Sequence, residues 1–473
     1  MIKNIFFRLF VGYVIINFIY STVAVAQGAG ISILRDAEIE QIIREMSEPI
    51  FIAAELEVDA VDTYLVNDST INAFVAGGQN VFINSGLLLK AETANQVIGV
   101  IAHETGHIAL GHLSRHSEGM GQFATYSLMG VLLGAVAMAA GSADAGMALM
   151  MGGQHVGYRS LLKFTRTQES SSDQVAAKYL DATGQSGRGL IEFFEILGDQ
   201  ELVPKKYQDP YASTHPMNST RIERLIDRVQ ESPYYDAPLN PEIEAKFQLL
   251  QAKLFGYLKP FHATMVRYPI GDDSLHARYA RTFAYQQSDR FDQALAEIET
   301  LIQDYPENPF FRETKGQILY ENGHVIESID AYREAVVRLP SSNLLRMSFA
   351  QSLISADDDR YLAEAIENLE IALEQEPNNS FGWRQASMAY HRNNDDAMTH
   401  YSTAQHFLLS GDVRGAMINA KKALDLLPKD SPKWIRAQDI LMAGQTGMDK
   451  RMTEEEELRE QEQKERQKER NRS

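Results

Sequence analysis

The segment His103-Glu104-Thr105-Gly106-His107 constrains the fold of this chain more than any other part of the sequence. Residues four apart on an α-helix lie about 40° apart in projection, so His103 and His107 can share one metal ion if this segment is helical. Glu104 then stands beside the first ligand, where its carboxylate can reach a water molecule without binding the metal. This pattern is typical of zinc peptidases, in which the glutamate takes a proton from the attacking water.

The residues before and around this motif predict a small sheet beside a long helix. A first helix is expected from about Asp36 to Leu56, and Thr93 can begin the motif helix, which should run to about His116. Three short apolar runs predict strands, with a glycine-rich hairpin between the last two: Tyr64–Val66, Ala73–Ala76 and Asn80–Ile83. An extended substrate could pair with the third strand, through Asn80, Val81, Phe82 and Ile83.

A catalytic zinc ion takes three protein ligands, so a third must come from elsewhere in the chain. His112 is a poor candidate because it lies five residues after His107, about 140° around the same helix. Glu169 and Asp173 are better candidates, because they stand four apart on a second predicted helix. One carboxylate could bind the metal while the other hydrogen-bonds a ligand histidine or assists the leaving group. A solvated acidic first turn of that helix is the alternative.

The His103-Glu104-x-x-His107 motif, with Glu169-x-x-x-Asp173 about 60 residues later, resembles the gluzincin peptidase family. This family includes HtpX, the mitochondrial Oma protease and the CAAX prenyl proteases. With its leader and C-terminal repeats, the chain is most similar to the BepA-like periplasmic protease-chaperones of Gram-negative bacteria. The resemblance implies one zinc ion per chain bound by His103, His107 and Glu169. It further implies that Glu104 is the general base and Asp173 the proton donor.

A later segment, residues 213–221, contains His215-Pro216 followed by Arg221. The same resemblance implies that His215 can occupy the fourth zinc position and hold the protease latent, with Arg221 as an accessory residue. The alternative is an ordinary turn histidine before a helix that begins near Ser219.

The N-terminus predicts a cleaved signal peptide over residues 1–26. Lys3 and Arg8 precede an apolar stretch, and Ala24-Val25-Ala26 offers a small-x-small cleavage pattern. An uncleaved membrane anchor is the alternative, although no stable transmembrane anchor is expected. The chain has no cysteine, so any metal must be held by histidines and carboxylates. A formal net charge of −19 argues against nucleic-acid binding.

Residues 119–160, between the two ligand segments, are rich in Gly, Ala and Met. The apolar runs 128–140 and 145–153 are each shorter than the roughly 20 residues that a helix needs to cross a bilayer. A buried helical hairpin is the favoured interpretation. Membrane contact and a mobile lid over the metal, hinged at the flanking glycines, are left open.

The second half of the chain repeats a small residue followed by a proline twelve positions later. The pairs are Ala294 and Pro306, Ser328 and Pro340, Ala365 and Pro377, and Ala416 and Pro428. The first two prolines are 34 residues apart, which is the period of the tetratricopeptide repeat. The next intervals, 37 and 51, predict a short insertion near Asp357 and an extra helix around residues 383–391. Stacked repeats form a groove for protein partners, whereas bracing of the catalytic domain is the alternative.

These features predict an α+β, mainly α, fold. A zincin-type metalloprotease domain with a small sheet beside the motif helix is followed by an α-solenoid of tetratricopeptide repeats. The expected domains are a signal peptide (1–26), a zinc metalloprotease domain (27–240), a repeat domain (241–445) and a charged, disordered tail (446–473).

The predicted function is zinc-dependent cleavage of peptide bonds by an endopeptidase in the periplasm. By resemblance, its substrates are unfolded or misassembled outer-membrane proteins, and the barrel-assembly machinery is a partner through the repeat groove. The alternative is a chaperone or scaffold with a latent zinc site, in which the repeats bind protein partners.

Overall fold

The computed structural model describes residues 31–115, 125, 128–129, 143–197, 210–216 and 219–446. The predicted signal peptide, nearly all of the apolar run 128–140 and all but the first residue of the predicted tail lie outside the described residues. The chain divides into two compact units, one of which spans Ser32–Arg290 while the other begins at Phe291. The predicted domain boundary at residue 240 stays a proposal, since helices up to Arg290 belong to the first unit.

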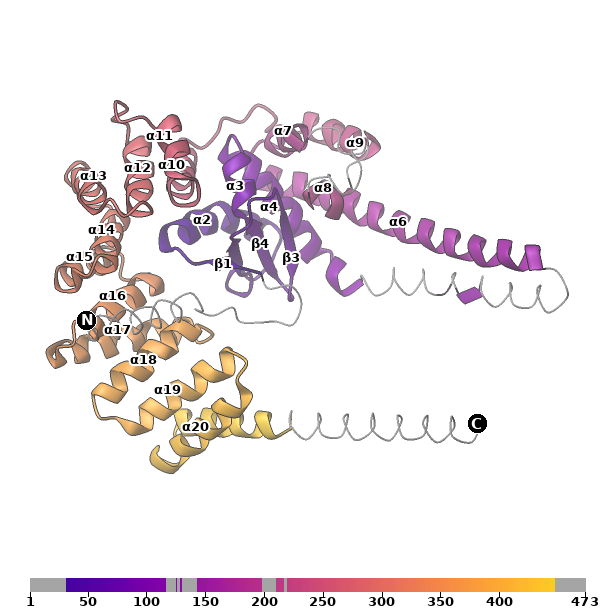
Figure 1. Ribbon diagram of the computed structural model, residues 1–473. Helices are drawn as coiled ribbons and strands as arrows, with labels where there is room; N and C mark the ends of the chain where they lie inside the picture. The colour runs from indigo at the N-terminus through magenta and orange to yellow at the C-terminus, as the bar shows by residue number, and fades with distance from the viewer. Residues whose placement is uncertain are drawn as a thin grey trace, which may run out of the picture. The chain divides into compact units, whose positions relative to one another are not determined.

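The first unit contains a four-stranded sheet with strand order β1-β2-β4-β3 (Figure 1). Its strands are β1 (Ile33–Leu34), β2 (Thr63–Val66), β3 (Ala73–Ala76) and β4 (Asn80–Asn84). β2 and β4 are parallel and the other neighbours are antiparallel. The predicted hairpin joins β3 to β4, and its Gly77 and Gly78 have φ values of +59° and +102°, which favour glycine. The three predicted strands are therefore confirmed.

The prediction that β4 pairs with a substrate is wrong. Asn80, Val81, Phe82 and Ile83 lie in a strand with a hydrogen-bonded neighbour on both sides, β2 and β3. A strand inside a sheet has no unpaired backbone edge to offer. The edge strand on this side of the sheet is β3.

Helices surround the sheet and supply most of the core of the first unit. They are α2 (Ala37–Ala53), α3 (Ser85–Lys90), α4 (Ala94–Ala109), α6 (Ala143–Ala182), α7 (Arg188–Leu197), α8 (Pro210–Thr214), α9 (Ser219–Gln230), α10 (Pro241–Leu258), α11 (Phe261–Arg267) and α12 (Leu275–Gln286), with a 3-10 turn at Val58–Ala60. Side-chain caps begin the first and third of these, because Asp36 accepts from the Ile39 amide and Thr93 from the Gln96 amide.

Helix α4 carries the histidine motif, and glycines let its neighbours approach closely. A Cβ added at Gly106 would lie 2.8 Å from a methyl group of Val175 on α6, and one at Gly99 would lie 2.8 Å from Leu190 on α7. Both distances are shorter than ordinary van der Waals contact. Gly106, inside the motif, therefore allows α6 to bring its acidic residues against α4.

Helix α4 ends earlier than the sequence predicts. Its last residue is Ala109, and Gly111 follows with φ +63°. A glycine in this left-handed conformation commonly stops a helix. His112 therefore begins a new turn, and its predicted position around the motif helix is wrong.

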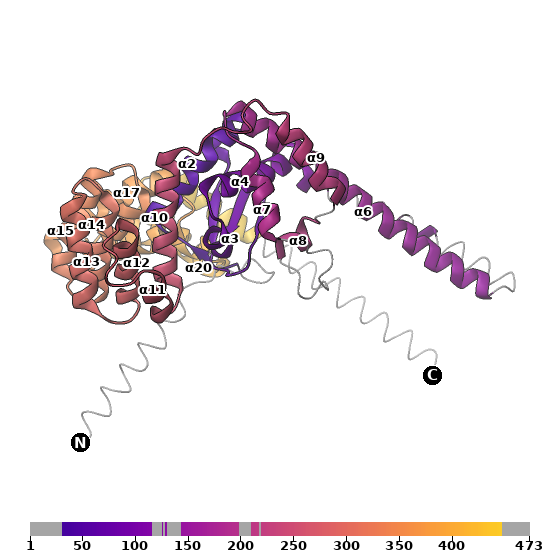
Figure 2. The same ribbon diagram turned by 90° about the horizontal axis from the view of Figure 1, so that it is seen from above.

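Helix α6 is one continuous helix of 40 residues from Ala143. Figures 1 and 2 show its N-terminal part extending away from the sheet. The described apolar side chains of this part are exposed, including Met147, Met151 and Val156. The favoured interpretation of a buried hairpin is therefore wrong for these residues. Among the described residues, no helix combines the length and apolar character needed to span a membrane.

The second unit is a series of antiparallel helices. They are α13 (Phe291–Asp304), α14 (Pro309–Glu321), α15 (Val325–Arg338), α16 (Asn343–Ser355), α17 (Leu362–Gln375), α18 (Ser380–Arg392), α19 (Asp396–Leu409) and α20 (Val413–Leu426), with a 3-10 turn at Asp359–Tyr361. The four small residues of the predicted repeat are fully buried: Ala294, Ser328, Ala365 and Ala416. The 3-10 turn and α18 coincide with the predicted insertion and the predicted extra helix, so both are confirmed.

Candidate metal centre

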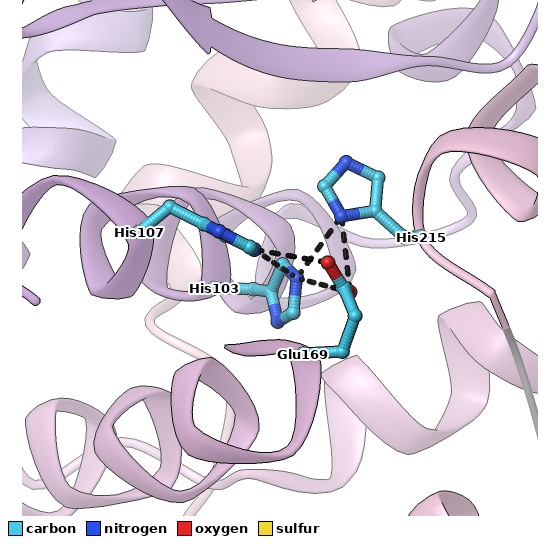
Figure 3. Close-up of side chains that lie close together, drawn as sticks. All are labelled: His103, His107, Glu169 and His215. Atoms are coloured by element: carbon cyan, nitrogen blue, oxygen red, sulfur yellow. Dashed lines mark hydrogen bonds and ion pairs between the residues drawn. The ribbon is translucent and has the colours of Figure 1, made fainter. Parts of the chain in front are cut away.

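Four buried side chains converge beside α4 (Figure 3): His103, His107, Glu169 and His215. The two motif histidines come from α4, Glu169 from α6, and His215 from the residue after α8. One ligand atom from each residue lies within 4.8 Å of the others. The sequence thus named all four members of this cluster, although they span more than 100 residues of chain.

The spacing of these atoms fits a tetrahedral metal. His103 Nε2 lies 3.1 Å from His107 Nε2, 3.3 Å from His215 Nδ1 and 3.3 Å from Glu169 Oε2. Glu169 Oε2 is 3.1 Å from His215 Nδ1, and Oε1 is 3.5 Å from His107 Nε2. A tetrahedron with metal bonds of about 2.0 to 2.1 Å has edges of roughly 3.3 Å. Three nitrogen donors and one carboxylate are also a donor set that suits zinc.

Glu104 lies on α4 beside this cluster and is fully buried. Neither of its carboxylate oxygens has a hydrogen-bond partner among the described residues. His215 Nε2 lies 3.4 Å from Oε1. Burial raises the pKa of Glu104, while the nearby His215 and His103 oppose that rise. A buried carboxylate without a protein donor is suited to accept a proton from a bound water or substrate.

Asp173 lies behind the metal-facing edge of His103. Its Oδ1 is 2.9 Å from His103 Nδ1, whereas the opposite ring atom, Nε2, faces the cluster. Burial disfavours the charge of Asp173, but Arg221 outweighs it and lowers the pKa of the carboxyl group. An ionised Asp173 on this side of the ring is suited to accept a hydrogen bond from the ligand His103. It is not suited to donate a proton to a leaving group, because an ionised carboxylate carries none.

Arg221, from α9, connects the two carboxylates with the His215 segment. Its guanidinium contacts both Asp173 oxygens and lies 3.0 Å from Glu169 Oε2. It also donates to the backbone carbonyl of His215, at 3.2 Å. Arg221 is only 3 % exposed, so these contacts are shielded from water. The accessory role expected for Arg221 becomes specific: it fixes both Asp173 and the turn that carries His215.

His215 is held in place by its own helix as well. Its ring stacks on Tyr211 with centroids 4.5 Å apart, and its amide donates to the Tyr211 carbonyl. The Tyr211 amide in turn donates to the carbonyl of Ile71, just before β3. Sequence reasoning missed Tyr211, although a position four residues before His215 on a short helix is where a stacking partner could be sought.

His112 is a second residue whose role the sequence did not reveal. It does not belong to the metal cluster, but its Nδ1 lies 3.1 Å from Nδ1 of His107. Ser171 and Ser172 hydroxyls lie 3.4 Å and 3.3 Å from its two ring nitrogens. Burial lowers the pKa of both His107 and His112, which favours neutral rings. If His107 binds a metal through Nε2, its Nδ1–H can donate to His112.

Residues 33–229 of the chain match peptidase family M48, and residues 284–343 match the tetratricopeptide repeat. The M48 match covers less than half of the chain. All the residues of the metal cluster lie within the M48 match. The predicted resemblance to a peptidase family, together with tetratricopeptide repeats, is confirmed, and the M48 match supports assignment to the metallopeptidases.

Several curated relatives are similar to this chain. The chain is 26% identical over 325 residues to the beta-barrel assembly-enhancing protease of Yersinia pestis. The aligned region covers 68% of this chain and 65% of that protein, slightly less than two thirds of its length. It is 22% identical over 361 residues to the protein of the same name from Escherichia coli (strain K12), covering 75% of this chain and 72% of the relative. The metalloprotease LoiP of Escherichia coli is 30% identical over 171 residues, 35% of this chain and 61% of LoiP.

Proposed function

We propose that this chain is a zinc-dependent endopeptidase. The observation that carries the proposal is the tetrahedral spacing of His103, His107, Glu169 and His215 beside a buried Glu104, which has no hydrogen-bond donor among the described residues. A zinc ion bound there would polarise a substrate carbonyl and acidify a water molecule. Glu104 would take the proton from the attacking water and deliver it to the leaving amine.

The remaining residues would position these groups. Asp173 would accept a hydrogen bond from Nδ1 of His103 and thereby direct Nε2 at the metal. Arg221 would keep Asp173 ionised and both carboxylates in place. We assign Asp173 this positioning role in place of the proton donation implied by the resemblance.

An extended substrate would be oriented by β3 rather than β4. β3 packs near α4 and pairs with β4 on one side, so its other edge has backbone groups without a strand partner among the described residues. Backbone hydrogen bonds to this edge would hold an unfolded segment across the metal centre with little dependence on its side chains.

His215 gives the second candidate function its support. Because its Nδ1 occupies the fourth corner of the cluster, a substrate carbonyl or water could not bind there at the same time. The protein would then act as a chaperone or scaffold while latent and as a peptidase once His215 withdraws. The repeat unit would bind protein partners in both states.

The cellular role proposed is quality control and assembly of outer-membrane proteins in the periplasm. The leader-like first 26 residues support export. Two relatives named beta-barrel assembly-enhancing protease support unfolded outer-membrane proteins as substrates and the barrel-assembly machinery as a partner.

The test compares the zinc-loaded wild type with Glu104→Gln on an unfolded protein substrate, with zinc content measured for both. We expect Glu104→Gln to keep zinc and to lose cleavage by at least about a hundredfold. Equal cleavage by both proteins would overturn the assignment of Glu104.

A parallel comparison with His215→Ala tests latency. If His215 masks the fourth position, this variant cleaves several times faster than wild type and still binds zinc through three ligands. Slower cleavage with full zinc content would instead make His215 part of the catalytic apparatus.

A further inference from the structure

A cavity of about 950 Å³ lies next to the metal centre, between α6 and α9 and the end of α4. Four arginines line it: Arg159 and Arg166 from α6, and Arg221 and Arg224 from α9. None of the lining residues among those described is acidic. This is unusual in a chain whose formal net charge is −19.

Three of these arginines are available to a ligand. Arg159, Arg166 and Arg224 are exposed and make no ion pair or hydrogen bond with any described residue. Arg221 differs, since its guanidinium is already bound to Asp173 and Glu169. Unpaired guanidiniums around one cavity repel each other unless an anion neutralises them, and their planar N–H groups match a carboxylate.

The rest of the lining also favours an anion. The first turn of α9 contributes Thr220, so the positive end of that helix borders the cavity. Ser170 and Gln174 from α6 add a hydroxyl and an amide.

The position of the cavity relates it to the scissile bond. Ser170 directly follows the metal-cluster residue Glu169, whereas Arg166 and Arg159 lie about 4.5 Å and 15 Å further back along the axis of α6. An extended chain advances about 3.3 Å per residue, so these arginines could meet groups roughly two to five residues from the metal.

We propose that this cavity is a carboxylate-binding subsite for the polypeptide substrate. The proposal rests on the proposed endopeptidase function. The subsite would select a carboxylate a few residues from the cleaved bond, either an Asp or Glu side chain or the C-terminus of the peptide. A peptide carboxylate fits better than a lipid phosphate because the lining reaches the metal centre: it includes Arg221, which contacts Glu169, and Ser170, which directly follows Glu169.

The experiment measures peptide binding without cleavage. Zinc-loaded full-length Glu104→Gln protein is titrated into fluorescent peptides that differ only by Glu or Gln at one position, each with a free or an amidated C-terminus. We expect the Glu peptide to bind about fivefold to tenfold more tightly at low ionic strength and less so at high salt. A preference for the free over the amidated peptide would identify the C-terminal carboxylate as the group bound.

Arginine variants then test whether the preference for acidic peptides arises at this cavity. Arg166→Gln and Arg224→Gln, each added to Glu104→Gln, should reduce the ratio of the two affinities toward one. Arg384→Gln is the matched control, because Arg384 is exposed, makes no ion pair among the described residues and belongs to the repeat unit. It should leave the ratio unchanged.

Equal binding of all four peptides, or a preference that survives both cavity variants, would overturn the inference. The inference would also be overturned if the cavity bound inorganic phosphate and no acidic peptide could displace it, since the site would then be one for phosphate. Because binding is read without cleavage, failure here leaves the endopeptidase proposal standing. If the zinc-loaded wild type cleaved no peptide but the binding preference for acidic peptides remained, the endopeptidase proposal would be overturned and the carboxylate subsite would stand.

Discussion

Arg221 and Asp173 form a buried ion pair with two parallel contacts, of which Nη2 to Oδ1 measures 2.8 Å. The pair lies directly behind His103, because the same Oδ1 is 2.9 Å from the His103 ring. Two charges removed from water are favourable only while both are present and hydrogen-bonded. The metal centre is therefore supported by a contact between α6 and α9 that contains no metal ligand of its own.

Removal of Arg221 should destabilise the first unit strongly. Arg221→Ala leaves Asp173 buried without its partner, so we expect the free energy of unfolding to fall by about 3 kcal/mol or more. Denaturant unfolding of the zinc-loaded protein measures this change. Arg224→Ala, on the exposed side of the same helix, is the control and should change it by less than about 0.5 kcal/mol. Equal effects of the two variants would contradict the role of the pair.

The metal-free protein should lose stability as the pH rises. Although burial opposes its charge, hydrogen bonds with Asp173 and Glu169 raise the pKa of His103 to about 9, from an ordinary value of 6.5. Protonated His103 therefore contributes its full stabilisation to the folded state below pH 6.5, where the residue is protonated in both the folded and the unfolded chain. This stabilisation is lost as the pH rises through about 9, where His103 of the folded protein loses its proton. A rise of this size corresponds to roughly 3 kcal/mol as an upper limit.

Unfolding of chelator-treated protein between pH 6 and pH 9.5 measures this loss. The slope should be absent in His103→Gln, which cannot be protonated, and in the zinc-loaded wild type, where the metal takes the place of the proton. A flat profile for the metal-free wild type would contradict the prediction.

Loss of the His112 hydrogen bond should weaken metal binding. His112→Phe removes the acceptor for Nδ1 of His107, and such outer partners commonly change metal affinity by about tenfold to a hundredfold. His112→Asn keeps an acceptor and should recover much of the affinity. Competition with a chromophoric chelator measures affinity, and the visible spectrum of the cobalt-substituted protein reports ligand geometry. His262→Phe, an exposed position in the same unit, is the control; an equal loss there would argue against a specific role for His112.

The repeat unit should be sensitive to added volume at Gly316. A Cβ at this position would lie 2.9 Å from the ring of Tyr332, which is itself buried. We expect Gly316→Ala to destabilise the second unit by about 1 to 3 kcal/mol, seen as a shift of one transition in thermal unfolding. Gly271→Ala is the control because no atom of the described part of the chain lies within 4 Å of its added Cβ. If both variants unfold like wild type, the repeat core is less tightly packed than the structure indicates.

Much of the metal centre could be predicted from the chain alone because its signals are local. Two histidines four apart, a glutamate and an aspartate four apart on a second helix, and a His-Pro turn are each visible within ten residues. The repeat helices are equally local, since a small residue and a proline at a fixed interval mark where one helix crosses another and where it ends.

The tertiary structure decided what local patterns leave open. Whether a strand lies at the edge or inside a sheet depends on pairing between distant segments, so the sequence located β4 but assigned it the wrong role. The place of His112 depended on a single left-handed glycine, Gly111, which turned its ring back onto His107. The arginine cavity needs α6 and α9 to pack together, which no spacing reveals. The sequence by itself determined that His103 and His107 can share a metal ion, because helical periodicity is a property of neighbouring residues. Only packing decided which charges are paired and which remain available to a ligand.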